Sequence, residues 1–280
     1  MALQLLGNNS VERIGLVDAD PMVASFWRVV FFDSEWLCDQ IENIDVSVSS
    51  WKRMRSASHD GDREKALACL FLNRTSFSGI LALTAGPIGG KEQKSDYKID
   101  CRFPRNTLVR RVRTAASFKD RVDFVWGLSW KRAMSRIAKM RKNGGLSDDV
   151  FFYFDPPFFK KADRLYRFYF EDKDHVDLRD HIIAMKDPWI LSYDYDPMVE
   201  ELYSESRPVN HVDLLYNTPN SGNHLVAKEA VVSNLRRLPS RQETWITLAG
   251  QTSGDGQVGQ EPELVARVNE GGSAATPVPK

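Results

Sequence analysis

The 280-residue sequence has few cysteines, no long hydrophobic run and no net charge. Its three cysteines, Cys38, Cys69 and Cys101, lack the paired spacing of a disulfide framework or a zinc site and fit a reducing compartment. No apolar run approaches the ~20 residues that cross a bilayer, and the amino terminus lacks the charged start of a signal peptide. We therefore expect a protein of the cytoplasm without a membrane segment.

Charge is balanced over the whole chain, with 38 Lys and Arg against 38 Asp and Glu, but it is unevenly distributed. Residues 101–145 contain only two acidic residues, Asp120 and Asp123. The basic residues of this stretch are Arg102, Arg105, Arg110, Arg111, Arg113, Lys119, Arg121, Lys131, Arg132, Arg136, Lys139, Arg141 and Lys142. Such a block can attract a phosphate backbone. The alternative is a set of solvated helix faces.

Five consecutive apolar or aromatic residues, 150–154, predict a strand buried on both faces of a parallel sheet. Asp155, Pro156, Pro157 and Phe158 follow directly. Because proline cannot donate a ladder hydrogen bond and biases the preceding residue towards extended backbone, we expect a stiff loop here. Open α/β sheets place their ligands at the carboxyl ends of such strands. An ordinary exit from strand to turn is the alternative.

The loop has the groups needed to methylate an exocyclic amino group on an aromatic base. The lone pair of such a nitrogen is delocalised into the ring, so an enzyme must hold its N–H groups with acceptors and draw the nitrogen towards tetrahedral geometry. The carboxylate of Asp155 and the carbonyl of Pro156 can do this, and the ring of Phe158 can stack on a base that has left the helix. The run Asp-Pro-Pro-Phe resembles the corresponding motif of amino-group DNA methyltransferases, which use S-adenosylmethionine.

A second point of resemblance precedes this loop in the chain. Leu72, Asn73, Arg74 and Gly79 match the Leu-Asn-Arg-x-x-x-x-Gly pattern that Dam-type DNA adenine methylases carry between the cofactor half and the recognition insert. From chemistry alone, Asn-Arg after a helix could be a capping pair with a surface charge. The order of the two motifs is also that of the family, and the resemblance covers about residues 11–235.

The resemblance implies an α/β fold: a Rossmann-like methyltransferase sheet, incomplete at its amino-terminal side, with an inserted and largely helical DNA-recognition region. Residues 1–72 and 146–248 would form the catalytic core and residues 73–145 the target-recognition insert. Residues 249–280 are rich in Gly, Ser, Pro and Glu without periodicity, so we expect a disordered tail.

The implied activity is site-specific DNA adenine methylation with S-adenosyl-L-methionine as cofactor and double-stranded DNA as partner, as in restriction-modification. In this reading Asp155, Pro156, Pro157 and Phe158 are the catalytic residues. Cytosine remains an alternative target base, because its amino group presents the same chemistry. A catalytically silent DNA-binding relative or subunit is a further alternative.

The cofactor half of the site is expected at a short strand over residues 13–17 that ends in acidic residues. A carboxylate at the end of such a strand can accept hydrogen bonds from ribose hydroxyls, which favours Asp18, with Asp20 second. Asp155 is a further expected cofactor-binding residue. Asp20-Pro21 also reads as a helix start. The glycine-rich turn that cradles the methionine end of the cofactor in this family does not precede the strand, so we expect an upstream segment or a partner chain to supply it.

DNA contacts are expected from residues in and around the insert. The glycine-rich stretch 84–94 reads as a mobile DNA-contacting loop, and a run of arginines follows in the next helix. Lysines also follow the Asp-Pro-Pro-Phe motif. The expected DNA-binding residues are Asn73, Arg74, Lys91, Arg110, Arg111, Arg113, Lys160 and Lys161.

The remaining patterns place helices and strands along the chain. Helices are expected over residues 1–9, 22–32, 60–75, 175–185 and 197–204, and from Asn106 and Ser129. A strand and turn are expected over residues 97–104, strands over residues 121–126 and 160–169, and a buried strand over residues 188–194. A terminal hairpin pairs residues 212–216 with 229–233.

Overall fold

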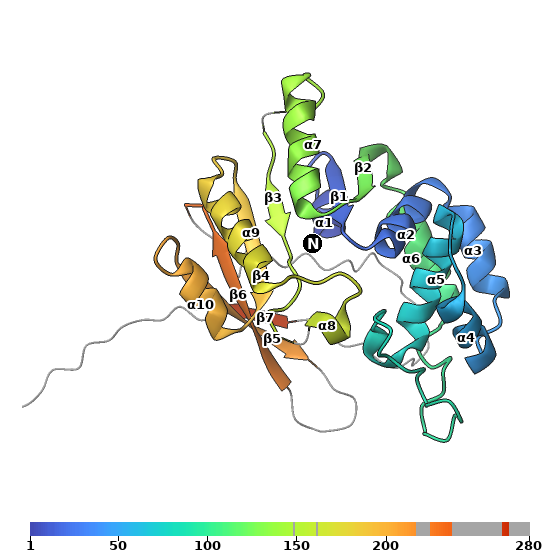
Figure 1. The fold of residues 1–280 in the computed structure, drawn as a ribbon. Helices are drawn as coiled ribbons and strands as arrows, with labels where there is room; N and C mark the ends of the chain where they lie inside the picture. The colour runs from blue at the N-terminus through green and yellow to red at the C-terminus, as the bar shows by residue number, and fades with distance from the viewer. Residues whose placement is uncertain (148, 161, 217–224, 237–264, 269–280) are drawn as a thin grey trace, which may run out of the picture. The chain divides into compact units, whose positions relative to one another are not determined.

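The computed structural model describes residues 1–147, 149–160, 162–216, 225–236 and 265–268 (Figure 1). Over these residues the protein is mixed α/β, with ten α-helices and two small sheets. The chain divides into two compact units. Unit 1 comprises Met1–Asp148 and Lys161–Tyr169, and unit 2 comprises Asp149–Lys160 and Phe170–Lys280.

Unit 1 is mostly helical. Its α-helices are α1 (Ala2–Gly7), α2 (Pro21–Phe32), α3 (Ser34–Asn43), α4 (Val48–Ser56), α5 (Asp62–Thr75), α6 (Arg105–Ala116), α7 (Trp130–Lys142) and α8 (Ala162–Leu165). Two short 3-10 helices, η1 (Phe77–Gly79) and η2 (Lys119–Arg121), complete the helical segments of this unit. The helices expected from the sequence are present, except that α6 begins one residue before Asn106, with Pro104 at its N-cap.

The sheet of unit 1 pairs β1 (Ile14–Asp18) with β2 (Val122–Gly127) in parallel, so Asp18 lies opposite Gly127 at the carboxyl ends of both strands. Both strands were expected. Burial of β1 is weaker than its apolar sequence indicates, because only Ile14 is fully buried. Gly15 lies opposite Phe124, whose ring occupies the space that a Cβ atom at position 15 would need.

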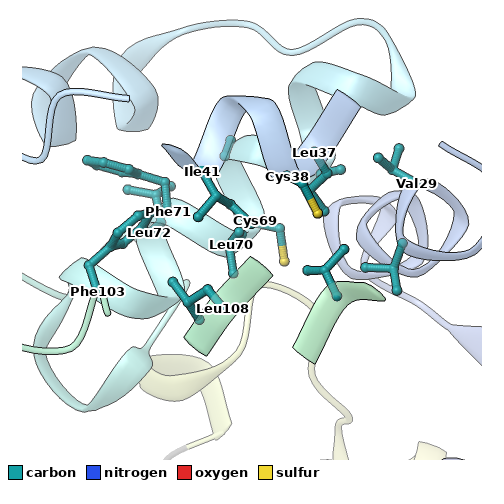
Figure 2. Close-up of a cluster of buried hydrophobic side chains, with 14 of the residues drawn as sticks. Val29, Leu37, Cys38, Ile41, Cys69, Leu70, Phe71, Leu72, Phe103 and Leu108 are labelled. Carbon is teal, nitrogen blue, oxygen red and sulfur yellow. The ribbon is translucent and has the colours of Figure 1, made fainter. Parts of the chain in front are cut away.

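The core of unit 1 forms where α2, α3, α5 and α6 pack together. Figure 2 shows part of this core, with side chains from each of these helices directed towards one another. Val30 is buried, and Val23, Phe26 and Trp27 pack against the core while partly exposed, so these four residues form the apolar face of α2. The buried members labelled in the figure are Val29, Leu37, Cys38, Ile41, Cys69, Leu70, Phe71, Leu72, Phe103 and Leu108.

The strand predicted over residues 97–104 is wrong. This segment forms successive turns, in which the Cys101 amide donates to the Lys98 carbonyl at 3.1 Å and the Phe103 amide donates to the Asp100 carbonyl at 2.8 Å. Ile99 and Phe103 are both buried. A turn lets these two apolar side chains reach the same core, whereas an isolated strand would have no neighbour to satisfy its backbone.

The strand predicted over residues 160–169 is also wrong. Its described part contains α8, and the Tyr166 amide donates to the Ala162 carbonyl at 2.9 Å in a helical turn. Tyr166, Phe168 and Tyr169 are exposed beyond it. The mixture of aromatic and basic residues lacks the strict alternation that a half-buried strand requires.

Unit 2 is built on a five-stranded sheet with the order β3-β4-β6-β5-β7. The strands are β3 (Phe152–Phe154), β4 (Trp189–Asp194), β5 (Val209–Tyr216), β6 (Leu225–Ser233) and β7 (Val265–Val268). β3 and β4 are parallel, while β6 is antiparallel to both β4 and β5. The terminal hairpin is therefore confirmed as the β5–β6 pair, although residues 212–216 lie opposite residues 225–229 and not opposite 229–233. Helices α9 (Asp172–Ala184) and α10 (Pro197–Tyr203) accompany the sheet.

The two parallel strands differ in burial. β4 is buried as predicted, with Trp189, Leu191 and Tyr193 almost inaccessible to solvent. The prediction that β3 is buried on both faces is wrong: Phe152 is buried, but Tyr153 is 39% exposed. β3 lies at the edge of the sheet within the described residues of this unit, so it has a single neighbouring strand to cover it.

The expected insert, residues 73–145, lies in unit 1 together with residues 1–72. Most of the expected tail, residues 249–280, lies outside the described residues, and its described part is β7. Within the described ranges, no helix is both long and apolar enough to span a bilayer.

Candidate active site

The Asp-Pro-Pro-Phe loop leaves the sheet of unit 2 exactly where β3 ends. Phe154 lies opposite Leu191 of the parallel strand β4, so Asp155 follows beside Ser192. The Ser192 hydroxyl donates to Oδ1 of Asp155 at 3.5 Å and lies 2.7 Å from the hydroxyl of Tyr153. Pro156 is buried. The loop is therefore fixed at its start by a buried proline and by a hydroxyl group from the neighbouring strand.

Three carboxyl groups share this end of the sheet. Asp194 ends β4 and lies opposite Glu229 of β6. Asp155 is exposed as a residue, but partial desolvation of its carboxyl group raises its pKa, and the Ser192 hydroxyl opposes that rise. Burial also raises the pKa of Asp194 and of Glu229, and the negative charge of Asp155 adds to the effect at both. This end of the sheet therefore favours groups that donate hydrogen bonds or carry positive charge.

An aromatic cluster supports the far end of the loop. The ring of Phe159 stacks on the imidazole of His175 from α9, with centroids 3.9 Å apart, and lies 4.8 Å from the ring of Tyr193. Nδ1 of His175 lies 2.9 Å from the Tyr193 hydroxyl, and burial lowers the pKa of this histidine. These contacts fix the position of Phe159. The two residues before it, Pro157 and Phe158, are half-buried.

Sequence reasoning missed Ser192, His175 and Glu229. Ser192 was visible only as one polar residue inside an apolar strand, and His175 only as the start of an expected helix. Their link to the loop depends on strand pairing and helix packing between segments that are far apart in the chain. A polar residue within an otherwise apolar strand was the single sequence signal for Ser192.

Two of the three predicted cofactor carboxylates, Asp18 and Asp20, lie in unit 1, and Asp155 lies in unit 2. Asp18 is half-buried at the end of β1, and its Oδ1 accepts a hydrogen bond from the Asp20 amide at 2.7 Å. Asp20 is buried and caps α2 by accepting from the Met22 amide at 2.8 Å. Its Oδ1 also lies 3.1 Å from Nη1 of Arg167. Asp20 is thus the helix start that the sequence indicated.

Burial raises the pKa of Asp20, while the Met22 amide and the charge of Arg167 oppose that rise. A carboxylate that caps a helix and pairs with an arginine is already solvated by the protein. Asp18 is the better ribose acceptor of the two because it is more accessible at the strand end. Asp18 lies in unit 1, and Asp155 lies in unit 2.

The Leu-Asn-Arg-x-x-x-x-Gly motif has a local structural role. The Asn73 side-chain amide donates to the Gly79 carbonyl at 3.0 Å, and Arg74 donates to the Arg102 carbonyl at 2.6 Å. Gly79 has φ +72°, and a Cβ atom there would lie 3.1 Å from Nδ2 of Asn73. Leu72 is buried. These contacts fold the chain tightly after α5, but Asn73 and Arg74 lie inside the helix and its C-cap is Ser76, so they are not a capping pair.

The other predicted DNA-binding residues differ in their exposure and in their contacts. Lys91, Arg110 and Arg111 are exposed, the last two on α6. Arg113 donates to both carboxylate oxygens of Glu35, at 3.2 and 2.8 Å.

In unit 2, Nζ of Lys160 lies 2.9 Å from Oδ2 of Asp196, which caps α10. Lys161 lies outside the described residues.

Within the part of the chain that the structure describes, no group of three or more His, Cys, Asp or Glu side chains is arranged to hold a metal ion. Comparison with known proteins found no family model that matches this chain and no matching curated protein.

Proposed function

We propose that this protein is a DNA adenine methyltransferase that uses S-adenosylmethionine. The observation that carries the proposal is the position of Asp155, Pro156, Pro157 and Phe158 at the carboxyl end of β3, beside the parallel strand β4. Ligands of α/β sheets bind at such ends. In a cell whose DNA lies in the cytoplasm, a DNA methyltransferase would act in that compartment.

The loop holds the groups that would meet a flipped base. The Asp155 carboxylate and the Pro156 carbonyl would accept hydrogen bonds from the N–H groups of the exocyclic amine. The ring of Phe158 would stack on the base, an interaction worth about 1–3 kcal/mol per base. The stacking of Phe159 on His175 keeps the segment that carries Phe158 against the sheet.

Asp155 contributes most when positive charge develops on the amine nitrogen. The carboxylate is partly desolvated, so its interaction with that charge is stronger than it would be in water. The charge exists only once the nitrogen attacks the methyl carbon. Asp155 therefore stabilises the transition state more than the bound substrate, and the proton leaves the nitrogen after it has become acidic.

The strand directions also support the proposal. β3, β4 and β5 run in the same direction, with β6 reversed between β4 and β5. One reversed strand between two strands of the other direction is the arrangement that the proposed Rossmann-like methyltransferase fold would have at this edge, and β7 adds a further antiparallel strand beside β5. The expected division into catalytic core and recognition insert remains part of this proposal.

When bound, S-adenosylmethionine supplies an electrophilic methyl group. Among the described residues, Asp18 fits the ribose hydroxyls of this cofactor, because a half-buried carboxylate at the end of a parallel strand is an acceptor that is not wholly solvated by water. Asp20 fits less well, since Met22 and Arg167 already contact its Oδ1.

The test measures transfer of a labelled methyl group from S-adenosylmethionine to duplex DNA by the full chain, with the modified base identified by mass spectrometry of digested DNA. We expect methylated adenine. Asp155→Ala should lower the rate by roughly 100- to 1000-fold, the usual effect of losing one preorganised stabilising group. DNA affinity, measured by fluorescence anisotropy, should not change. Asp180→Ala is the matched control, because Asp180 is an exposed carboxylate of the same unit that pairs with Arg179.

Three results would overturn the proposal. Methylated cytosine would assign the other amino base. An Asp155→Ala protein as active as the wild type would remove the proposed mechanism. Wild-type protein that binds DNA but transfers no methyl group would support the catalytically silent alternative.

A further inference from the structure

The basic residues of the 101–145 block are not equivalent once the chain is folded. Arg105 donates to the backbone carbonyls of Ile41, Glu42 and Ile44. Arg121 donates to the carbonyls of Leu6, Val11 and Glu12. Arg113 pairs with Glu35. These arginines hold segments of unit 1 together, and their charges are already compensated by acceptors.

Helix α7 is different. It carries Lys131, Arg132, Arg136, Lys139, Arg141 and Lys142 and contains no acidic residue. Among the described residues, Arg132, Lys139 and Lys142 have no hydrogen-bonding or ion-pairing partner for their side chains. An open hollow of about 430 Å³ lies along this helix, and its lining consists of Leu128, Lys131, Arg132, Ser135, Arg136 and Lys139. Three cations without such a partner thus lie along one face of α7.

Helix stability does not explain the cations at the start of α7. Positive side chains are favourable near the carboxyl end of a helix and unfavourable in its first turn, where the helix dipole is positive. Lys131 and Arg132 stand in that first turn without any acidic neighbour there. Their placement lowers helix stability slightly and raises the positive potential of the hollow.

One cation of the hollow is held in place by an aromatic stack. The guanidinium of Arg136 lies 4.3 Å from the ring centroid of Trp126, and Trp126 stacks on Phe124 with centroids 3.7 Å apart. Both rings belong to β2. A cation that is fixed on a ring face loses less side-chain entropy when an anion binds than a freely moving one does.

The apolar face of α7 is already occupied. Ala133 and Ile137 are buried, and Trp130, Met134 and Met140 are half-buried. A basic helix that binds a lipid surface inserts its apolar face into the membrane. Because the fold of unit 1 uses that face, α7 offers a partner its cationic face alone. This favours the phosphate backbone of a nucleic acid over a membrane surface.

We propose that the α7 face formed by Lys131, Arg132, Ser135, Arg136 and Lys139 binds the phosphate backbone of duplex DNA. The choice of DNA rests on the proposed function. Lys131 and Lys139 are eight residues apart on the helix, which is roughly 12 Å at 1.5 Å per residue. That length matches three or four phosphates of one strand at about 3.4 Å of helix axis each. Phosphate contacts carry no sequence information, so the contribution of this face is independent of sequence.

The test compares salt-dependent DNA binding by the full chain, using fluorescence anisotropy with a labelled duplex. The test variant is Arg132→Gln with Lys139→Gln, and the control is Lys52→Gln with Lys119→Gln, two exposed cations elsewhere in unit 1. Each phosphate contact contributes about 0.9 to the slope of log K against log salt. Losing two contacts should therefore lower the magnitude of this slope by about 1.8. The gain in affinity on dilution from about 200 to 50 mM salt should then be roughly 12-fold smaller for the test variant than for the wild type.

The control pair should keep the wild-type slope, and Arg132→Lys with Lys139→Arg should keep most of it. Circular dichroism verifies that each variant is folded. An unchanged slope in the test variant would overturn the proposal, as would binding to vesicles of anionic phospholipid that requires Arg132 and Lys139 while duplex DNA is not bound. Tighter binding of single-stranded RNA than of duplex DNA through these residues would also overturn it.

Methyl transfer is measured on the same proteins. If α7 governs DNA binding and no methyl group is transferred, the proposed function fails and the α7 inference stands. If transfer occurs and the salt slope of the test variant is unchanged, the α7 inference fails and the proposed function stands.

Discussion

The imidazole of His175 and the ring of Phe159 stack in unit 2 with centroids 3.9 Å apart and an interplanar angle of 19°. Phe159 directly follows the Asp-Pro-Pro-Phe loop, and His175 lies in the first turn of α9. His175 is almost inaccessible to solvent, and Nδ1 lies close to the Tyr193 hydroxyl. The loop is thus linked to the core of unit 2 through a titratable ring that the fold keeps neutral.

The first prediction concerns pH. Burial lowers the pKa of His175, against the opposing charges of Asp172 and Asp174, while the unfolded chain titrates near pH 6.5. The unfolded state therefore binds more protons as the pH falls below about 6.5, and the free energy of unfolding should decrease there, by at most about 1.4 kcal/mol per pH unit from this group. Urea denaturation at neutral and mildly acidic pH measures the decrease.

His175→Phe keeps an aromatic ring at this position but removes the titration, so its stability should fall less on acidification. Burial also lowers the pKa of His181, which leaves a residual decrease in this variant. Identical pH dependence in the wild type and His175→Phe would show that His175 is not the group responsible.

The second prediction concerns Ser192, a positioning residue in the proposed mechanism. Its hydroxyl lowers the pKa of Asp155, so Ser192→Ala should move the acidic limb of the pH–rate profile of methyl transfer to higher pH. The variant also leaves the Tyr153 hydroxyl without its contact, at a cost of about 0.5–1.5 kcal/mol in stability. Ser192→Thr should restore the profile. A profile that stays fixed in Ser192→Ala would limit Ser192 to a structural role.

The third prediction concerns the turn after α5. Gly79→Ala places a Cβ atom in the left-handed region and against Asn73, so we expect a loss of about 1–3 kcal/mol in stability. Gly90→Ala has a similar φ, +74°, but open space, and should lose about 1 kcal/mol from conformation alone. Gly86→Ala meets no atom within 4 Å and should change stability by about 0.5 kcal/mol or less. Equal effects for all three in urea denaturation would contradict the role assigned to Gly79.

The fourth prediction concerns thiol chemistry. Burial raises the pKa of the Cys69 thiol to about 12, and burial also raises that of Cys38. Cys101 is exposed. Alkylation of the native protein near pH 8 should therefore modify Cys101 first, as read by mass spectrometry, and Cys101→Ser should abolish the rapid reaction. Rapid modification of Cys69 in the native state would show that the α5 core opens readily.

Local patterns in the sequence were sufficient where one segment carries its own signal. The helix α2, its start at Asp20 and the strand β4 were all read correctly, because periodicity, capping and β-propensity act between near neighbours. The start of the Asp-Pro-Pro-Phe loop at the end of a strand was also readable, since proline terminates a strand locally.

Tertiary contacts were needed where a residue's role depends on a distant partner. Residues 97–104 form turns because Ile99 and Phe103 pack into a helical core, and β3 is half-exposed because it has one neighbouring strand among the residues that the structure describes. The basic block was visible in the sequence, but its division into bonded arginines and the uncompensated face of α7 was not. Backbone carbonyls and carboxylates from remote segments compensate some cations, and only the folded chain brings those acceptors within hydrogen-bonding distance.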